Sequence, residues 1–142
     1  MPFSGLRGPF DLTKHGVEAA VDQRSPGAYA LGRTNEVGTF VISFVGRADS
    51  DLGARLLEHV AVEWYPHFKA VYCATPNAAF EKECSLFHDF GQRALDNKTH
   101  PAPPPNSTWQ CPRCRVFALA DGAGPVNHRR DIATSDKVAV MQ

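Results

Sequence analysis

One carboxylate stands where a helix expects an apolar side chain. A helix is predicted over residues 75–90, and Glu83 lies in the middle of an apolar stripe that also contains Ala79, Leu86 and Phe90. Glu81 lies on a different, polar face. A carboxylate facing the core costs several kcal/mol unless it has a partner or a metal. Two interpretations remain open: Glu83 pairs with an arginine, or it binds Mg²⁺, which commonly takes one or two carboxylates.

Two residues of the preceding predicted helix, 52–62, could act on a phosphate. Arg55 and His59 are four residues apart and therefore share one helix face. An arginine stabilises phosphate charge that grows in a transition state, and a histidine can move a proton or hold a phosphate. An ordinary solvated helix face has the same spacing. Arg47, directly after Gly46, is a further cation that carries no signal by itself.

The cysteines suggest a second kind of chemistry. Cys111 and Cys114 have the C-x₂-C spacing of a zinc knuckle, but a closed zinc site needs four ligands and the chain has no second C-x₂-C. Cys84 and His88, one turn apart on the Glu83 helix, complete a structural zinc site in the first interpretation. His100 replaces one of these two in the second. The alternative to both is a pair of thiols in a loop.

The elements that must position these residues form an α+β fold. We expect a small three-stranded sheet, mixed or antiparallel, flanked by helices. The elements follow in the order helix, strand, strand, helix, strand, helix, at residues 11–22, 27–31, 39–45, 52–62, 68–74 and 75–90. The first two strands form a hairpin that places Tyr29 opposite Phe44.

Length and composition limit the class of protein. The chain has 142 residues, 43% hydrophobic and 21% charged, which is typical of one soluble globular domain. Lys plus Arg equals Asp plus Glu, 15 of each, so the chain is not a uniformly basic nucleic-acid coat. No apolar run approaches the roughly 20 residues that span a bilayer. Together with the absence of a signal-peptide pattern at the start, this predicts a cytoplasmic protein with no membrane partner.

Four segments are expected along the chain. They are an N-terminal approach segment, a core that contains the helices and strands from the hairpin onward, a proline-rich arm with the C-x₂-C pair, and a polar C-terminus. Their bounds are residues 1–26, 27–100, 101–120 and 121–142.

The order of motifs resembles the GIY-YIG nucleases. Gly27-Ala28-Tyr29 is similar to the first element of that family, and Phe44-Val45-Gly46 is similar to the second. The family then has a basic residue, an arginine, often a histidine, a glutamate on a later helix and an asparagine after it. This sequence has, in that order, Arg47, Arg55, His59, Glu83 and Asn97.

The resemblance implies a role for each matching residue. Glu83 would bind a single divalent metal, Mg²⁺ or Mn²⁺, on the phosphate, and Arg55 would neutralise the developing charge. Tyr29 and His59 would belong to the catalytic set, with the tyrosine hydroxyl orienting or deprotonating the attacking water. Gly46, Arg47 and Asn97 would contact the substrate. Phe44 departs from the pattern, because it stands where the family has its second tyrosine and carries no hydroxyl.

Two functions follow as expectations. The first is a metal-dependent endonuclease that hydrolyses phosphodiester bonds of nucleic acid, with DNA as the expected substrate. The second is a non-catalytic module on the same frame, with a structural zinc, that binds nucleic acid or protein. Phe44 and the zero net charge favour the second, whereas the ordered set of matching residues favours the first.

Overall fold

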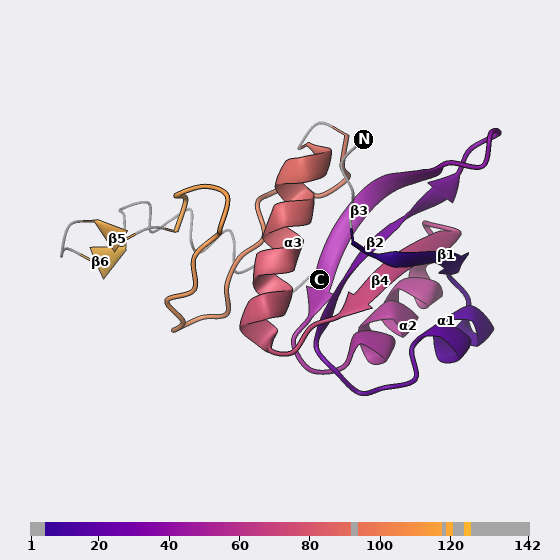
Figure 1. Cartoon of the computed structure of the whole chain (residues 1–142), viewed down its shortest axis with the longest axis horizontal. Helices are drawn as coiled ribbons and strands as arrows, with labels where there is room; N and C mark the ends of the chain where they lie inside the picture. The colour runs from indigo at the N-terminus through magenta and orange to yellow at the C-terminus, as the bar shows by residue number, and fades with distance from the viewer. Residues whose placement is uncertain (1–4, 92–93, 118, 121–123, 126–142) are drawn as a thin grey trace.

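A four-stranded antiparallel sheet lies between helices at the centre of the molecule (Figure 1). The structure, a computed structural model, describes residues 5–91, 94–117, 119–120 and 124–125. Most of the expected polar C-terminus, 121–142, lies outside these residues. In chain order the elements are β1 (Arg7–Asp11), α1 (Lys14–Ala20), β2 (Gly27–Thr34), β3 (Phe40–Ala48), α2 (Leu52–Val62), β4 (His67–Tyr72), α3 (Pro76–Phe90), β5 (Leu119–Ala120) and β6 (Gly124–Pro125).

The α+β class is confirmed, but the expected three-stranded sheet is wrong. The strand order is β1-β4-β2-β3, and β1 comes from the segment expected to hold only a helix. Gly8-Pro9 interrupts the pairing of β1 with β4, because proline has no N–H to donate, and it makes the segment resemble a turn. The helix starts later than predicted, with Thr13 rather than Asp11 as its N-cap.

The hairpin register differs from the prediction by two residues. Tyr29 lies opposite Gly46, and Leu31 lies opposite Phe44. Both strands end later than expected, β2 at Thr34 rather than residue 31 and β3 at Ala48 rather than residue 45, and a bulge follows Leu31. Because side chains alternate with a period of two, this shift leaves Tyr29 and Phe44 on the same face of the sheet.

The two faces of β2 serve two different cores. Tyr29 and Leu31 pack with Leu52 and Leu56 of α2 and with α1, whereas Ala28 and Ala30 pack against Leu86 and Phe87 of α3. Figure 1 shows the same division, with α3 on one side of the sheet and α1 and α2 on the other. The central strand is therefore buried on both faces.

The two predicted helices that carry chemistry are confirmed. Thr75 caps α3 at its start, Gly91 ends it, and α2 has the predicted bounds. Glu83 is fully buried whereas Glu81 is exposed, as the helical phase predicted. None of the helices within the described residues is long and apolar enough to cross a bilayer.

Gly46 is required by a close contact with Tyr29. A Cβ atom at Gly46 would lie 2.4 Å from the Tyr29 hydroxyl oxygen and 2.5 Å from Cζ. Real Cβ atoms do not approach other heavy atoms so closely, and Tyr29 is fully buried, so its ring has no room to move away. The tyrosine ring thus lies directly over the glycine of the neighbouring strand.

This contact predicts a costly substitution. Gly46→Ala is expected to lower the free energy of unfolding by about 1–3 kcal/mol or more, the usual cost of overpacking. Gly53→Ala is the matched control, because a Cβ there would meet nothing closer than 3.5 Å, and alanine is favoured over glycine in a helix by up to about 1 kcal/mol. Denaturant unfolding measures both. Equal stability of the two variants would contradict the contact.

Candidate functional site

A hydrogen bond joins the first tyrosine to the histidine of α2. The Tyr29 hydroxyl oxygen lies 2.8 Å from His59 Nε2. Burial raises the pKa of Tyr29, while burial, helped by the charge of Arg55, lowers the pKa of His59 to about 4. At neutral pH the phenol is therefore protonated and the imidazole neutral. The hydroxyl can donate to Nε2 when the other ring nitrogen carries the imidazole proton.

A buried ion pair lies on the opposite face of the sheet. Arg47 Nη1 is 2.8 Å from Glu83 Oε1, and Arg47 Nε is 2.8 Å from Asp49 Oδ1. Arg47 is 4% exposed and Glu83 0%. Burial opposes the charge of Arg47, but Glu83 and Asp49 outweigh it, so its pKa is raised. Removing one partner from such a pair costs about 3–5 kcal/mol, because it leaves a buried charge uncompensated. Of the two interpretations of Glu83, the structure displays the pairing with arginine.

The two pairs are close to one another in space. After burial, the largest influences on the pKa of Tyr29 are the charges of Arg55, Glu83, Glu58 and Arg47. Gly46 connects the two pairs, because the Tyr29 ring lies over it and Arg47 follows it on β3. The structure thus places the predicted catalytic residues around one position of β3, with Tyr29, His59 and Arg55 on the α2 side of the sheet and Glu83, paired with Arg47, on the α3 side.

Arg55 is the most accessible of these charged side chains. It is 28% exposed, and its one ion pair within the described residues is a surface contact of 3.1 Å with Glu58. It lines a hollow of about 150 Å³ at the start of α2, together with Asp49, Asp51 and Glu58. Since exposed ion pairs hold their partners weakly, the guanidinium can exchange Glu58 for another anion.

Asn97 holds the edge strand. Its side-chain oxygen accepts from the Val45 N–H at 2.9 Å, and its amide nitrogen donates to the Val45 carbonyl at 2.8 Å. The N–H of Asp96 donates to the Ser43 carbonyl beside it. Asn97 was predicted to contact substrate. In the structure its buried amide instead satisfies the outward-facing backbone of β3, one residue before Gly46.

Tyr65 belongs to this region although the sequence did not indicate it. The Phe44 ring lies between His59 and Tyr65, with ring-centroid distances of 5.6 and 6.3 Å. The Tyr65 hydroxyl donates to Asp96 Oδ2 at 2.6 Å. Burial and Asp96 raise the pKa of Tyr65. No local pattern marks Tyr65, since it comes from the irregular segment between α2 and β4.

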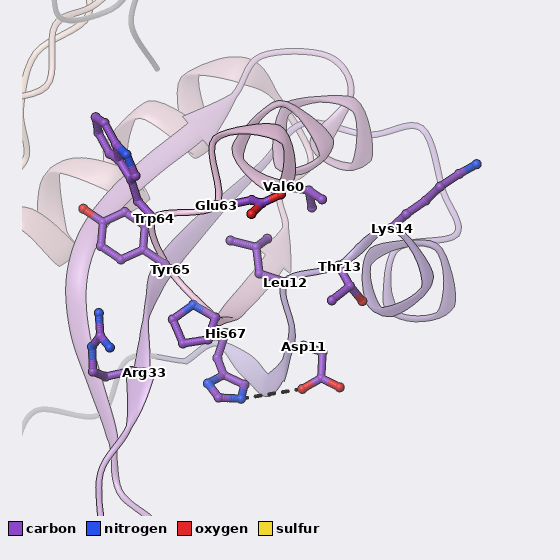
Figure 2. Close-up of a pocket in the computed structure, with 11 residues that line it drawn as sticks. Asp11, Leu12, Thr13, Lys14, Arg33, Val60, Glu63, Trp64, Tyr65 and His67 are labelled. Carbon is purple, nitrogen blue, oxygen red and sulfur yellow. Dashed lines mark ion pairs between the residues drawn. The ribbon is translucent and has the colours of Figure 1, made fainter.

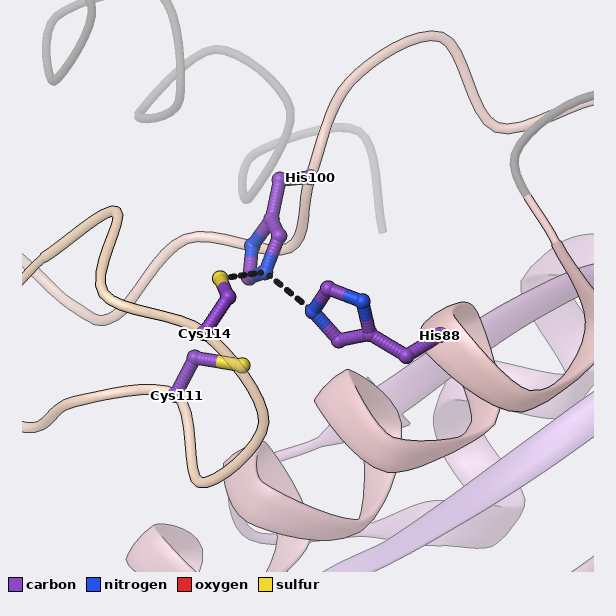
Figure 3. Close-up of side chains that lie close together, drawn as sticks. All are labelled: His88, His100, Cys111 and Cys114. Carbon is purple, nitrogen blue, oxygen red and sulfur yellow. Dashed lines mark hydrogen bonds between the residues drawn. The ribbon is translucent and has the colours of Figure 1, made fainter.

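A second cluster contains His88, His100, Cys111 and Cys114. One potential ligand atom from each lies within 4.8 Å of the others, so the group could hold a metal such as zinc. Figure 3 shows His88 of α3 and His100, just before the arm, facing the two cysteine sulfurs. The Nε2 atoms of His88 and His100 are 3.2 Å apart, and His100 Nε2 is 3.4 Å from Cys114 Sγ.

These two distances are close to those around a tetrahedral metal, and the remaining distances, of up to 4.8 Å, would shorten when a metal binds. Zinc bound at about 2.0–2.1 Å to nitrogen and about 2.3 Å to sulfur requires edges of about 3.3 Å between nitrogens and about 3.6 Å between nitrogen and sulfur. His100 Nδ1 lies 2.7 Å from the Pro101 carbonyl, which can only accept, so the lone pair of Nε2 faces the cluster. Burial also lowers the pKa of His88 and His100, which favours their neutral, metal-binding forms.

Cys84 was expected in the ligand set and is not among the four. It is fully buried and packs with Phe80 and Cys111 in one cluster. Burial raises the pKa of its thiol. The observed group is therefore the alternative set, in which His100 replaces Cys84, because the arm folds back along α3 beside His88.

Comparison with protein-family models, with curated proteins and with solved structures found no match to this chain.

The burial of His59 predicts acid sensitivity. Because the folded pKa of about 4 lies below the ordinary 6.5, the unfolded chain takes up this proton first. The stability that the neutral imidazole contributes is present above about pH 6.5 and is lost as the pH falls toward 4. NMR titration of the His59 ring should give a pKa near 4, and His59→Phe should remove this part of the pH dependence. Titration of His59 near 6.5 would show that the ring is solvated.

Proposed function

We propose that this chain is a metal-dependent phosphodiesterase that cuts nucleic acid, with DNA as the first substrate to test. The supporting observation is the gathering of the Tyr29–His59 pair, the Arg47–Glu83 pair and Arg55 around Gly46. Proton transfer, charge neutralisation and a carboxylate for a metal are the functions that phosphodiester hydrolysis needs. The order of these residues in the sequence also resembles the GIY-YIG nucleases.

The proton on the attacking water has a route in this arrangement. Once the 0% exposed Tyr29 hydroxyl is opened to the water, it would pass its proton to His59 Nε2, 2.8 Å away, as it takes a proton from the water. The low pKa of His59 leaves the imidazole unprotonated at neutral pH, and it also makes the ring a weaker base than an ordinary histidine. Phe44 offers no hydroxyl, so Tyr29 is the tyrosine of the motif pair that can act. His59 receives the proton and Tyr29 conducts it.

The charged residues would have different roles at the phosphate. Arg55, the accessible cation, neutralises charge on the phosphate as it develops. Glu83 and Asp49 both pair with Arg47, and their carboxylates are the kind of ligand that Mg²⁺ or Mn²⁺ prefers. A divalent ion bound there would withdraw charge from the phosphate and lower the pKa of the attacking water. Arg47 meanwhile balances the buried glutamate.

One observation favours the non-catalytic alternative. Tyr29 and Glu83 are both 0% exposed, and Glu83 is bound by Arg47. Buried residues of this kind also suit a structural role, in which Tyr29 and Glu83 stabilise the fold of a non-catalytic binding module. The two functions differ in what happens when the accessible Arg55 is removed.

The second cluster supports a structural zinc in either function. His88, His100, Cys111 and Cys114 supply four ligands, which leaves no position open for substrate. His88 comes from α3, His100 from the residue before the arm, and Cys111 and Cys114 from the arm itself. Zinc would therefore tie the segment after residue 97 to the helix that carries Glu83.

Arg55→Ala separates catalysis from folding. Its ion pair is exposed, so the fold should be spared, while the rate of plasmid cleavage in Mg²⁺ should fall by about 100-fold or more. Glu58→Ala is the matched control, because it removes the same ion pair but keeps the guanidinium. If both variants cut at the wild-type rate, or if the wild type does not cut, the catalytic proposal is wrong.

The zinc assignment predicts a selective loss of metal. Elemental analysis of the reduced chain should give about one zinc per molecule, and a chelator should lower the melting temperature because bound metal contributes to folding free energy. His100→Asn and Cys111→Ser should abolish the zinc. Cys84→Ala, the control for the excluded ligand, should retain it. Retention in His100→Asn and loss in Cys84→Ala would reverse the ligand set.

A further inference from the structure

Trp64 is the most exposed aromatic ring among those described, and it lies between two hollows. Trp64 is 72% exposed. Hollows of about 650 and 530 Å³ lie on its two sides, and both are lined by Arg33, Trp64 and Tyr65. Figure 2 shows Trp64 and Tyr65 just after α2, with Arg33 on the neighbouring β2 and the Trp64 ring projecting outward. A large apolar ring held in this way offers a flat surface to a ligand.

The smaller hollow has a positive character. Its charged lining consists of Arg33, Lys98 and Asp96. Asp96 is engaged by the Tyr65 hydroxyl at 2.6 Å. Arg33 and Lys98 are exposed, and neither has an ion pair within the described part of the chain. The hollow therefore presents two cations beside an aromatic face.

Packed side chains connect this hollow to the Tyr29–His59 pair. Tyr65, which lines the hollow, lies 6.3 Å from the Phe44 ring, and Phe44 lies 5.6 Å from the His59 ring. Asn97, also in the lining, holds Val45 next to Gly46. A ligand in the hollow is thus separated from the reacting groups by one aromatic side chain and one strand residue.

We propose that the Trp64 hollow binds one unpaired nucleotide of the substrate strand. The base stacks on the Trp64 indole, and its phosphate contacts Arg33 and Lys98. Every base has a π face, so an aromatic platform with adjacent cations suits single-stranded nucleic acid of any sequence. The volume of about 530 Å³ lies within the roughly 300–1,000 Å³ of sites for small organic groups. This inference rests on the proposed function and adds a preference for substrates with a single-stranded segment beside the scissile phosphate.

The first test observes Trp64 directly. The chain has two tryptophans, so Trp109→Phe leaves Trp64 as the only indole, and Trp64→Phe leaves Trp109. The full chain is titrated with oligothymidine of about ten nucleotides, a length within the roughly 4–16 nucleotides that a single-strand-binding domain covers. Mg²⁺ is omitted so that the strand stays intact. Emission should be quenched in Trp109→Phe and unchanged in Trp64→Phe.

The second test measures affinity by fluorescence anisotropy of a labelled oligothymidine. Trp64→Ala should weaken binding about tenfold or more, the scale expected for loss of one stacking platform, and Trp64→Phe should restore part of it. Arg33→Ala and Lys98→Ala should weaken binding and reduce its dependence on salt. Arg24→Ala, an exposed cation outside the hollow, is the control and should bind normally. A blunt duplex should bind less tightly than the single strand.

The outcomes separate this inference from the proposed function. If the wild type cuts plasmid while Trp64 emission and Trp64→Ala affinity stay unchanged, the Trp64 site is wrong and the nuclease proposal stands. If Trp64 is quenched but no cleavage occurs in Mg²⁺, the chain binds single strands at this hollow without cutting them. If neither quenching nor cleavage occurs, both fail.

Discussion

The contact between the Tyr29 ring and Gly46 determines where the other site residues can lie. Because no side chain at Gly46 intervenes, the tyrosine hydroxyl reaches across β3 to His59 on α2. The strand alternates its faces, so Arg47, the next residue, points the other way and meets Glu83 on α3. The side chain of Asn97 binds the backbone N–H and carbonyl of Val45, the preceding residue, at the open edge of the sheet. Three consecutive residues of one strand thus connect both layers of helices and the chain beyond α3.

Helix α3 connects this site to the cysteine tail. The guanidinium of Arg47 lies over the Phe80 ring, with Cζ 5.2 Å from the ring centroid. Phe80 also packs against Trp109 and Phe117 of the tail. The tail that carries the C-x₂-C pair therefore covers the ring on which Arg47 rests. A metal that fixed the tail would also support the Arg47–Glu83 pair, since both depend on the same packed cluster. The two clusters are distinct in chemistry but share a core.

Features set by local sequence could be predicted, and features set by long-range contacts could not. The bounds of α2 and α3 and the burial of Glu83 followed from helical periodicity, from the Thr75 cap and from Gly91. Strand β1 was missed because Gly8-Pro9 resembles a turn, and its pairing with β4 is formed across about 60 residues of chain. The sequence allowed an arginine partner for Glu83 but could not identify Arg47. It also could not choose His100 over Cys84, because that choice depends on how the proline-rich arm folds back.

The most direct test of the account is the rate at which the purified full chain cuts supercoiled plasmid, with Mg²⁺ present and with Mg²⁺ omitted. Omission is preferable to chelation, because a chelator would also remove zinc from the cluster of His88, His100, Cys111 and Cys114. The account predicts cleavage only with Mg²⁺, its loss in Glu83→Gln, where the amide oxygen can still accept from Arg47, and its retention in Glu81→Gln on the exposed face. Circular dichroism establishes that both variants are folded. Equal cleavage by a folded Glu83→Gln and the wild type, or no cleavage by the wild type, would contradict the central claim that these residues form a metal-dependent catalytic site.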